Sequence, residues 1–174
     1  MDIALTLAGL IIAAIGTYYT YKAFRATAPA GRRSSGTPSA GASRIAVAVV
    51  VDGSRVLMVR RQYNPERLTW QFPAGQMNPG ESPEHRAERE VRSETGVQCR
   101  PEAIIGERNH PQTQVHCSYV RCSYISGTAT NADPQENSEV AWVDAVEVAA
   151  RVSTDLDGEV LRFLDTLNAE RARD

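Results

Sequence analysis

Two glutamates, Glu90 and Glu94, stand four residues apart in a segment whose ends carry helix signals. Ser82 and Pro83 are residue types that cap and open a helix, and Gly96 is the type that ends one. A spacing of four residues puts both carboxylates on one helix face, one turn apart. Like charges so close are unfavourable alone, and a divalent cation would reverse that. Oxygen ligands of this kind suit Mg2+ or Mn2+, so the spacing indicates a metal site.

A longer pattern surrounds this pair of glutamates. It resembles the Nudix box, G-x5-E-x7-R-E-U-x-E-E-x-G-U, in which U is an aliphatic residue. The matching positions are Gly75, Glu81, Arg89, Glu90, Val91, Glu94, Gly96 and Val97. Ser93 departs from the pattern, because it stands where the box has the first of its paired glutamates. The alternative interpretation is a solvated helix rich in Glu and Arg, which does not account for glycines at both ends.

The resemblance implies an enzyme that cleaves a diphosphate linked to another group, with a divalent metal ion and water. It implies Glu90 and Glu94 as the central metal ligands, with the backbone carbonyl of Ala74 completing the protein's share of the shell. Glu81 matches a box glutamate that lies near the metal or assists catalysis. Arg89 matches an arginine that pairs with box carboxylates and orients them.

The resemblance places the catalytic base outside the box, in a later loop. Glu136 and Glu139 are the candidates, and Glu139 is favoured because it adjoins the apolar run 140–143. The alternative for each is a solvent-exposed loop acid. A general base must lie within hydrogen-bond reach of the attacking water, which the sequence does not show.

Substrate contacts are predicted just before the box. Arg60, Arg61 and Tyr63 are candidates for binding phosphate or base, with a polar strand end as the alternative for each. Trp70 is a candidate for stacking on a base, with a half-buried core indole as its alternative. Pro111 and the triplet P-A-G resemble ADP-ribose-cleaving members, although relatives that cleave nucleoside triphosphates have similar flanks.

Two functions follow as expectations. The first is Mg2+-dependent hydrolysis of a nucleoside triphosphate or an ADP-ribose-like nucleoside diphosphate at its pyrophosphate bond. The second is a weakly catalytic Nudix module that binds a nucleotide as a membrane-tethered sensor or scaffold, which Ser93 favours. With Glu90 and Glu94 retained, we expect a raised metal requirement rather than inactivity. Dimers are common in the family, so a homodimer is the partner that the resemblance allows.

The elements that must position these residues alternate between strands and helices. A buried strand at 45–51 and a second strand at 56–59 flank the turn signal Asp52-Gly53 and predict a hairpin. Further strands are predicted at 70–72, 103–105, 115–125 and 139–143, and helices at 83–95, 144–152 and around 160–167. This order predicts an α/β/α sandwich with a mixed sheet, which is also the fold that the Nudix resemblance implies over residues 44–152.

Composition narrows the class of protein. The chain has 174 residues and a formal net charge of −2, which gives no support for a nucleic-acid-binding surface. Three cysteines, Cys99, Cys117 and Cys122, cannot all pair within one chain and have no zinc-site spacing. We therefore expect buried free thiols.

The N-terminus predicts a membrane anchor. Residues 3–21 carry no charge over a length that, at ~1.5 Å per residue, spans a bilayer core. Basic residues follow the run and none precedes it, which predicts a single-pass protein of the cell membrane with its catalytic domain in the cytoplasm. A cleaved signal peptide and a buried core helix are the alternatives. The predicted organisation is a transmembrane helix at 1–25, a disordered linker at 26–43 and a Nudix domain at 44–174.

Overall fold

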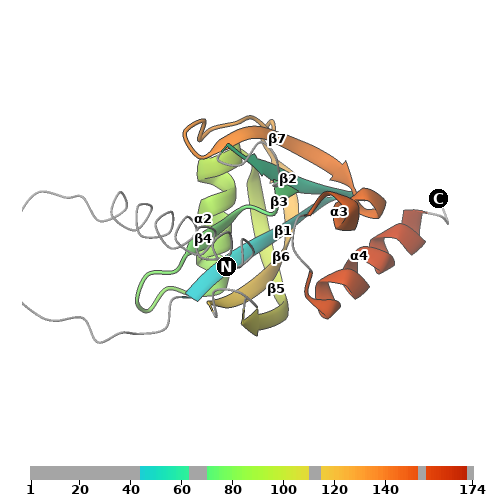
Figure 1. Ribbon diagram of the computed structural model, residues 1–174, viewed down its shortest axis with the longest axis horizontal. Helices are drawn as coiled ribbons and strands as arrows, with labels where there is room; N and C mark the ends of the chain where they lie inside the picture. The colour runs from blue at the N-terminus through green and yellow to red at the C-terminus, as the bar shows by residue number, and fades with distance from the viewer. Residues whose placement is uncertain (1–43, 63–69, 110–114, 153–155, 172–174) are drawn as a thin grey trace, which may run out of the picture.

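The computed structural model describes residues 44–62, 70–109, 115–152 and 156–171 (Figure 1). The predicted anchor at 1–25 and linker at 26–43 lie outside the described residues, and so do Tyr63 and Pro111. Within the described ranges, no helix is long and apolar enough to cross a membrane.

Seven strands and three helices make up the described part of the chain. The strands are β1 (Arg44–Asp52), β2 (Arg55–Arg61), β3 (Trp70–Gln71), β4 (Ala74–Gln76), β5 (Gln98–Asn109), β6 (His116–Ser126) and β7 (Asn137–Asp144). The helices are α2 (Pro83–Thr95), α3 (Ala145–Arg151) and α4 (Gly158–Arg171). The predicted hairpin and all three predicted helices are confirmed.

Strand β1 lies at the centre of one mixed sheet. The order is β3-β2-β1-β6-β5, with β4 also pairing with β1 and β7 with β2. β1 runs parallel to β6 from Arg44↔His116 to Val51↔Ser123, and antiparallel to β2 and β4. A sheet with both pairings is the mixed sheet that the sequence predicts.

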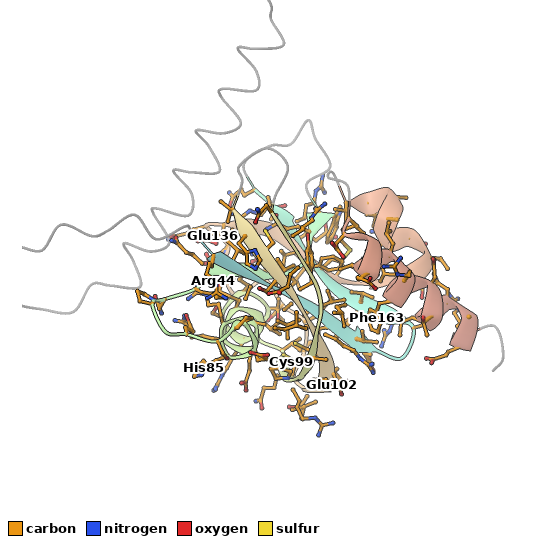
Figure 2. The ribbon with its side chains drawn as sticks, turned by 90° about the horizontal axis from the view of Figure 1, so that it is seen from below. Arg44, His85, Cys99, Glu102, Glu136 and Phe163 are labelled. Atoms are coloured by element: carbon orange, nitrogen blue, oxygen red, sulfur yellow. The ribbon has the colours of Figure 1, made fainter. Side chains whose placement is uncertain are left out.

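The two faces of β1 explain its unbroken apolar sequence. Ala46, Ala48 and Val50 point to one face, where they pack with Ala87 and Val91 of α2. The alternate residues of β1 point to the other face and belong to a core that includes residues of α3 and α4, with Ile45, Val47, Val49, Val148, Val160, Leu164 and Leu167 among its members. Helices therefore cover both faces, as Figure 1 shows, and the predicted α/β/α sandwich is confirmed. Figure 2 places His85 of α2 and Phe163 of α4 on opposite sides of the sheet.

Two strands differ from the prediction. β5 spans twelve residues rather than three, because it pairs along its whole length with β6 through three register shifts. Its sequence contains Pro101 and several charged residues, so period-2 alternation is broken and only the apolar core of the strand could be recognised. β4 was not predicted, because its three residues gain strand pairing only from β1. The predicted burial of Cys99, Cys117 and Cys122 is confirmed, and all three are free.

Candidate active site on the carboxylate face of helix α2

Helix α2 begins and ends where its sequence predicts. The Ser82 hydroxyl accepts a hydrogen bond from the backbone N–H of His85 at 3.2 Å, and Pro83 opens the first turn. Gly96 ends the helix in the left-handed conformation, with φ 70°, and its N–H donates to the carbonyl of Arg92. The caps fix where α2 begins and ends. Ala87 and Val91 pack on the sheet, and Glu90 and Glu94 both lie on the same buried side.

Gly75 lets strand β4 approach that face closely. It pairs with Ala46 of β1, on the side of the sheet that α2 covers. A Cβ at this position would lie 2.4 Å from Glu90 Cδ and 2.6 Å from Arg86 Nε and Nη2. Any side chain at residue 75 would therefore occupy the space of the Glu90 carboxylate, which gives the box glycine a steric reason.

Glu81 anchors the turn before the helix. Its Oε2 accepts a hydrogen bond from the backbone N–H of Asn78 at 2.8 Å. Nη2 of Arg89 donates to both carboxylate oxygens, at 2.7 and 3.1 Å. The pairing expected between Arg89 and a box carboxylate is present, and it holds Glu81 (11 % exposed) against α2.

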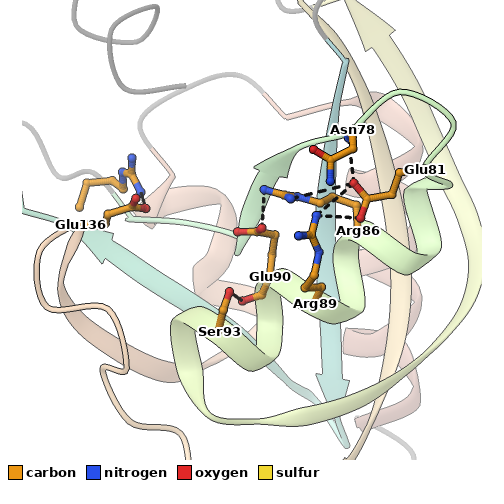
Figure 3. Close-up of polar contacts among 8 residues, drawn as sticks. Asn78, Glu81, Arg86, Arg89, Glu90, Ser93 and Glu136 are labelled. Atoms are coloured by element: carbon orange, nitrogen blue, oxygen red, sulfur yellow. Dashed lines mark hydrogen bonds and ion pairs between the residues drawn. The ribbon is translucent and has the colours of Figure 1, made fainter. Parts of the chain in front are cut away.

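Arg86 is a residue of this face that the sequence pattern did not identify. Its Nη2 lies 2.5 Å from Glu90 Oε1, and its Nη1 lies 4.0 Å from Glu81 Oε2. The side chains of Arg86 and Glu90 are each only 3 % exposed. Burial lowers the pKa of the Arg86 guanidinium, and the Glu90 carboxylate opposes that shift. Figure 3 shows Arg86 and Arg89 both reaching toward Glu81, while Arg86 also meets Glu90.

The pattern itself hides Arg86, because residue 86 is one of the seven positions between Glu81 and Arg89 that the box leaves unspecified. Helical spacing was the signal that could have found it. Arg86 precedes Glu90 by four residues, so on the predicted helix the two side chains are neighbours.

Glu94 is the most deeply buried carboxylate of the helix, at 1 % exposed. The segment after β6 covers this end of α2. The N–H of Ala132 donates to the Glu94 carbonyl and the N–H of Thr130 donates to the Thr95 carbonyl, both at 3.0 Å. The Thr95 hydroxyl also donates a hydrogen bond to the carbonyl of Val91. The last turn is thus held by its neighbours, which keeps Glu94 on the same face as Glu90.

Ser93, the position that departs from the box, points away from the core. It is exposed, and its hydroxyl donates to the backbone carbonyl of Glu90 at 3.2 Å. Residue 93 could therefore hold a longer acidic side chain in solvent without disturbing the core, but this chain has serine there.

The two candidates for the catalytic base have different surroundings. Glu136 is 4 % exposed, and its carboxylate lies 3.5 Å from Nη1 of Arg61. Its backbone is fixed at the β2–β7 junction, where its carbonyl accepts from Gln62 N–H and its N–H donates to Asp133. Glu139 has a side chain that is 52 % exposed and faces Arg60 across the β2–β7 pair. In the view of Figure 3, the Glu90 carboxylate extends from α2 toward the side on which Glu136 lies.

The residues predicted to contact substrate also differ in how far they are buried. Arg61 is largely buried, at 15 % exposed, whereas Arg60 is 38 % exposed. Trp70 is 6 % exposed within the core, and the guanidinium of Arg151 lies 5.8 Å from its ring centroid. For Trp70 the structure shows the core role that the sequence left open as an alternative.

The donor set of this face fits a hard divalent cation. In the ranges that the structure describes, no three His, Cys, Asp or Glu side chains converge as metal ligands. Mg2+ needs no such group, because it commonly takes one or two carboxylates and completes its octahedron with waters and substrate phosphates. Glu90 and Glu94 supply two carboxylates on one helix face, and the missing side chain at Gly75 leaves Glu90 room beside β4.

Curated relatives share part of this chain. A putative 8-oxo-dGTP diphosphatase of Bacillus subtilis is 33% identical over 97 residues, which are 56% of this chain and 62% of the relative. A MutT-like protein of Streptomyces ambofaciens is 28% identical over 71% of this chain and 75% of its own length. The human 8-oxo-dGDP phosphatase NUDT18 is 30% identical over 50% of this chain and 27% of its own length.

Solved structures share the fold at low identity. A Nudix hydrolase from Nitrosomonas europaea has a TM-score of 0.65 at 17% identity, covering 76% of this chain and 75% of that one. An ADP-ribose pyrophosphatase from Streptococcus suis has a TM-score of 0.57 at 16% identity, covering 77% and 96%. The family model for the NUDIX domain matches residues 42–164, which contain the whole of the carboxylate face just described. The chain therefore belongs to the Nudix family.

Proposed function

We propose that this chain hydrolyses a nucleoside diphosphate derivative at its pyrophosphate bond, with water as the nucleophile and a phosphate as the leaving group. The observation that carries the proposal is the buried pair Glu90 and Glu94 on one face of α2, against a strand whose glycine leaves room for them. A pyrophosphate carries several negative charges that repel an incoming nucleophile. The carboxylates of this face are also negative, so a cation is needed to bring the pyrophosphate to them.

Glu90, Glu94 and the Ala74 carbonyl would hold Mg2+ or Mn2+. When bound, the ion supplies neutralisation of the diphosphate charge and a lower pKa for coordinated water. The chain's own contribution is position. Caps fix α2, and the neighbouring loop fixes its last turn, so both carboxylates are held before substrate arrives.

Glu136 is our candidate for the group that accepts the water proton. It is buried and its backbone is held on both sides, whereas Glu139 is half exposed on the β7 strand. A buried acid held by a neighbouring arginine has a defined position, which proton transfer requires. Exchange of each glutamate for glutamine separates the candidates, because loss of the base flattens the acidic limb of the pH–rate profile and loss of a surface acid does not.

The substrate class follows from the relatives as an expectation for this chain. Nucleoside triphosphates, including those with an oxidised purine, come first, because the Bacillus subtilis and human relatives are named for 8-oxo-dGTP and 8-oxo-dGDP. ADP-ribose-like nucleoside diphosphates come second, through the fold shared with an ADP-ribose pyrophosphatase. Arg61, which pairs with Glu136, is the candidate for a phosphate contact.

A substrate panel tests this proposal. The full chain is incubated with Mg2+ or Mn2+ and nucleoside triphosphates, 8-oxo-dGTP, ADP-ribose, NADH or dinucleoside polyphosphates, and the products are resolved by chromatography. We expect one class to be hydrolysed and the activity to disappear when a chelator removes the metal. Hydrolysis that persists in excess chelator would contradict the assignment of Glu90 and Glu94 as metal ligands.

A second candidate function rests on Ser93. With a carboxylate missing from the box, a module that binds a nucleotide without turning it over would use the same face. Calorimetry on the same panel distinguishes the two, since tight nucleotide binding with no metal-dependent product favours the binding module.

A further inference from the structure

Arg86 brings a positive charge into the carboxylate face from within the chain. Its guanidinium is 3 % exposed and lies within ion-pair distance of Glu90, at 2.5 Å, and of Glu81, at 4.0 Å. It also lies directly under β4, because a Cβ at Gly75 would come within 2.6 Å of two of its nitrogens. Arg86 therefore fills space beside a carboxylate that the proposed function assigns to the metal.

The hydrogen-bonding capacity of the Arg86 guanidinium is not fully satisfied. Its Nε is buried and has no hydrogen-bond partner among the described residues. A buried ion pair is a weak source of stability, and an unsatisfied donor in the pair weakens its contribution further.

The net charge of the site indicates whether Arg86 strengthens or weakens the binding of a divalent ion. Glu81, Glu90 and Glu94 carry three negative charges, which Arg86 and Arg89 reduce to one. A divalent ion added to that set leaves an excess of positive charge. The same ion added after removal of Arg86 neutralises the set completely.

We propose that Arg86 is a built-in competitor for the metal: it neutralises Glu90 in the metal-free protein and must yield that carboxylate when a divalent ion binds. This inference rests on the proposed function for the assignment of Glu90 as a ligand. It makes the metal requirement of this chain a property of two positions, Arg86 and Ser93, of which only Ser93 departs from the box pattern.

Binding of Mn2+ to the full chain tests the proposal without any turnover. The electron paramagnetic resonance signal of free Mn2+ gives the dissociation constant for wild type, Arg86→Gln and Arg92→Gln. Arg92 lies on the same helix, is exposed, and loses the same charge in its variant. We expect Arg86→Gln to bind Mn2+ about tenfold or more tightly, and Arg92→Gln to stay within about threefold of wild type.

Thermal unfolding supplies a second readout. Arg86→Gln should melt at a lower temperature than wild type without metal, because Glu90 is then buried without its guanidinium. It should also gain more from saturating Mn2+ than wild type gains, because tighter binding to the folded state adds stability. If Arg86→Gln does not fold without metal, Arg86→Lys replaces it, since one ammonium cannot reach both carboxylates and should tighten Mn2+ binding by a few-fold.

Mn2+ binding that is unchanged or weaker in Arg86→Gln, or in its Lys replacement, would overturn the proposal and make Arg86 a residue that merely holds Glu90 in place. The proposed function fails in a different way. Tighter Mn2+ binding by the variant, with no compound of the panel hydrolysed, would support the role of Arg86 and contradict the hydrolase.

Discussion

Replacement of Gly75 by alanine perturbs the site at its tightest point. The new Cβ would lie 2.4 Å from Glu90 Cδ and 2.6 Å from Arg86 Nε, well inside contact distance. Both groups are ends of side chains, so they can move, but they are buried and paired with each other at 2.5 Å. The methyl group therefore displaces the ion pair rather than the backbone.

The magnitude follows from how far the pair is displaced. Overpacking of a filled interior costs about 1–3 kcal/mol when neighbours can shift. If Arg86 and Glu90 separate completely, the cost rises to about 3–5 kcal/mol, the range for a buried ion pair that loses one partner. We expect a loss of about 2–3 kcal/mol, because the two side chains can move together without separating.

Chemical unfolding of the full chain, followed by tryptophan fluorescence, measures this loss. Gly158→Ala is the matched control, since in the described part of the chain nothing beyond its chain neighbours and its own helix backbone lies within 4 Å of a Cβ there. The control should change the free energy of unfolding by no more than about 1 kcal/mol. A loss for Gly75→Ala no larger than that of the control would refute the close approach of β4 to the carboxylate face.

Three further predictions concern metal, thiols and membrane. Ser93→Glu should lower the Mg2+ concentration that gives half-maximal rate, because it restores a carboxylate at an exposed position; an unchanged requirement would refute this. Cys117 and Cys122 should react with a disulfide reagent on the order of 100-fold more slowly in the native protein than after unfolding, since burial raises the pKa of the Cys117 thiol and the hydrogen bond with Cys99 raises that of Cys122; equal rates would count against their burial. The full chain should sediment with membranes and be released by detergent but not by salt, and recovery in the soluble fraction would exclude the predicted anchor at 1–25.

The sequence predicted most of the fold because its local signals agree with the tertiary structure. The caps of α2, the apolar run of β1 and the spacing of apolar residues in α4 each describe an element that packs as its pattern indicates. The parallel pairing of β1 with β6 was not predictable in this way, because it joins segments about seventy residues apart. The length of β5 was missed for the same reason, since β6 rather than its own sequence completes it.

The site was predictable only as far as the box defines it. The positions of Arg89, Glu90 and Glu94 on α2 follow from helical spacing, and Glu81 lies in the turn that the box places before the helix. Arg86 was missed because a family pattern records what members share, and this guanidinium stands at an unspecified position. The difference between Glu136 and Glu139 depends on burial at a strand junction, which no local signal reports.

The most direct test of the proposed hydrolase compares two glutamate-to-glutamine variants on helix α2. Glu94 is buried on the carboxylate face, whereas Glu88 is exposed on the same helix and loses the same charge in its variant. With the substrate found by the panel, at saturating Mg2+, we expect Glu94→Gln to lose activity by about 100-fold or more while Glu88→Gln stays within about threefold of wild type. Equal rates for the two variants would contradict a metal-dependent site on this face of α2.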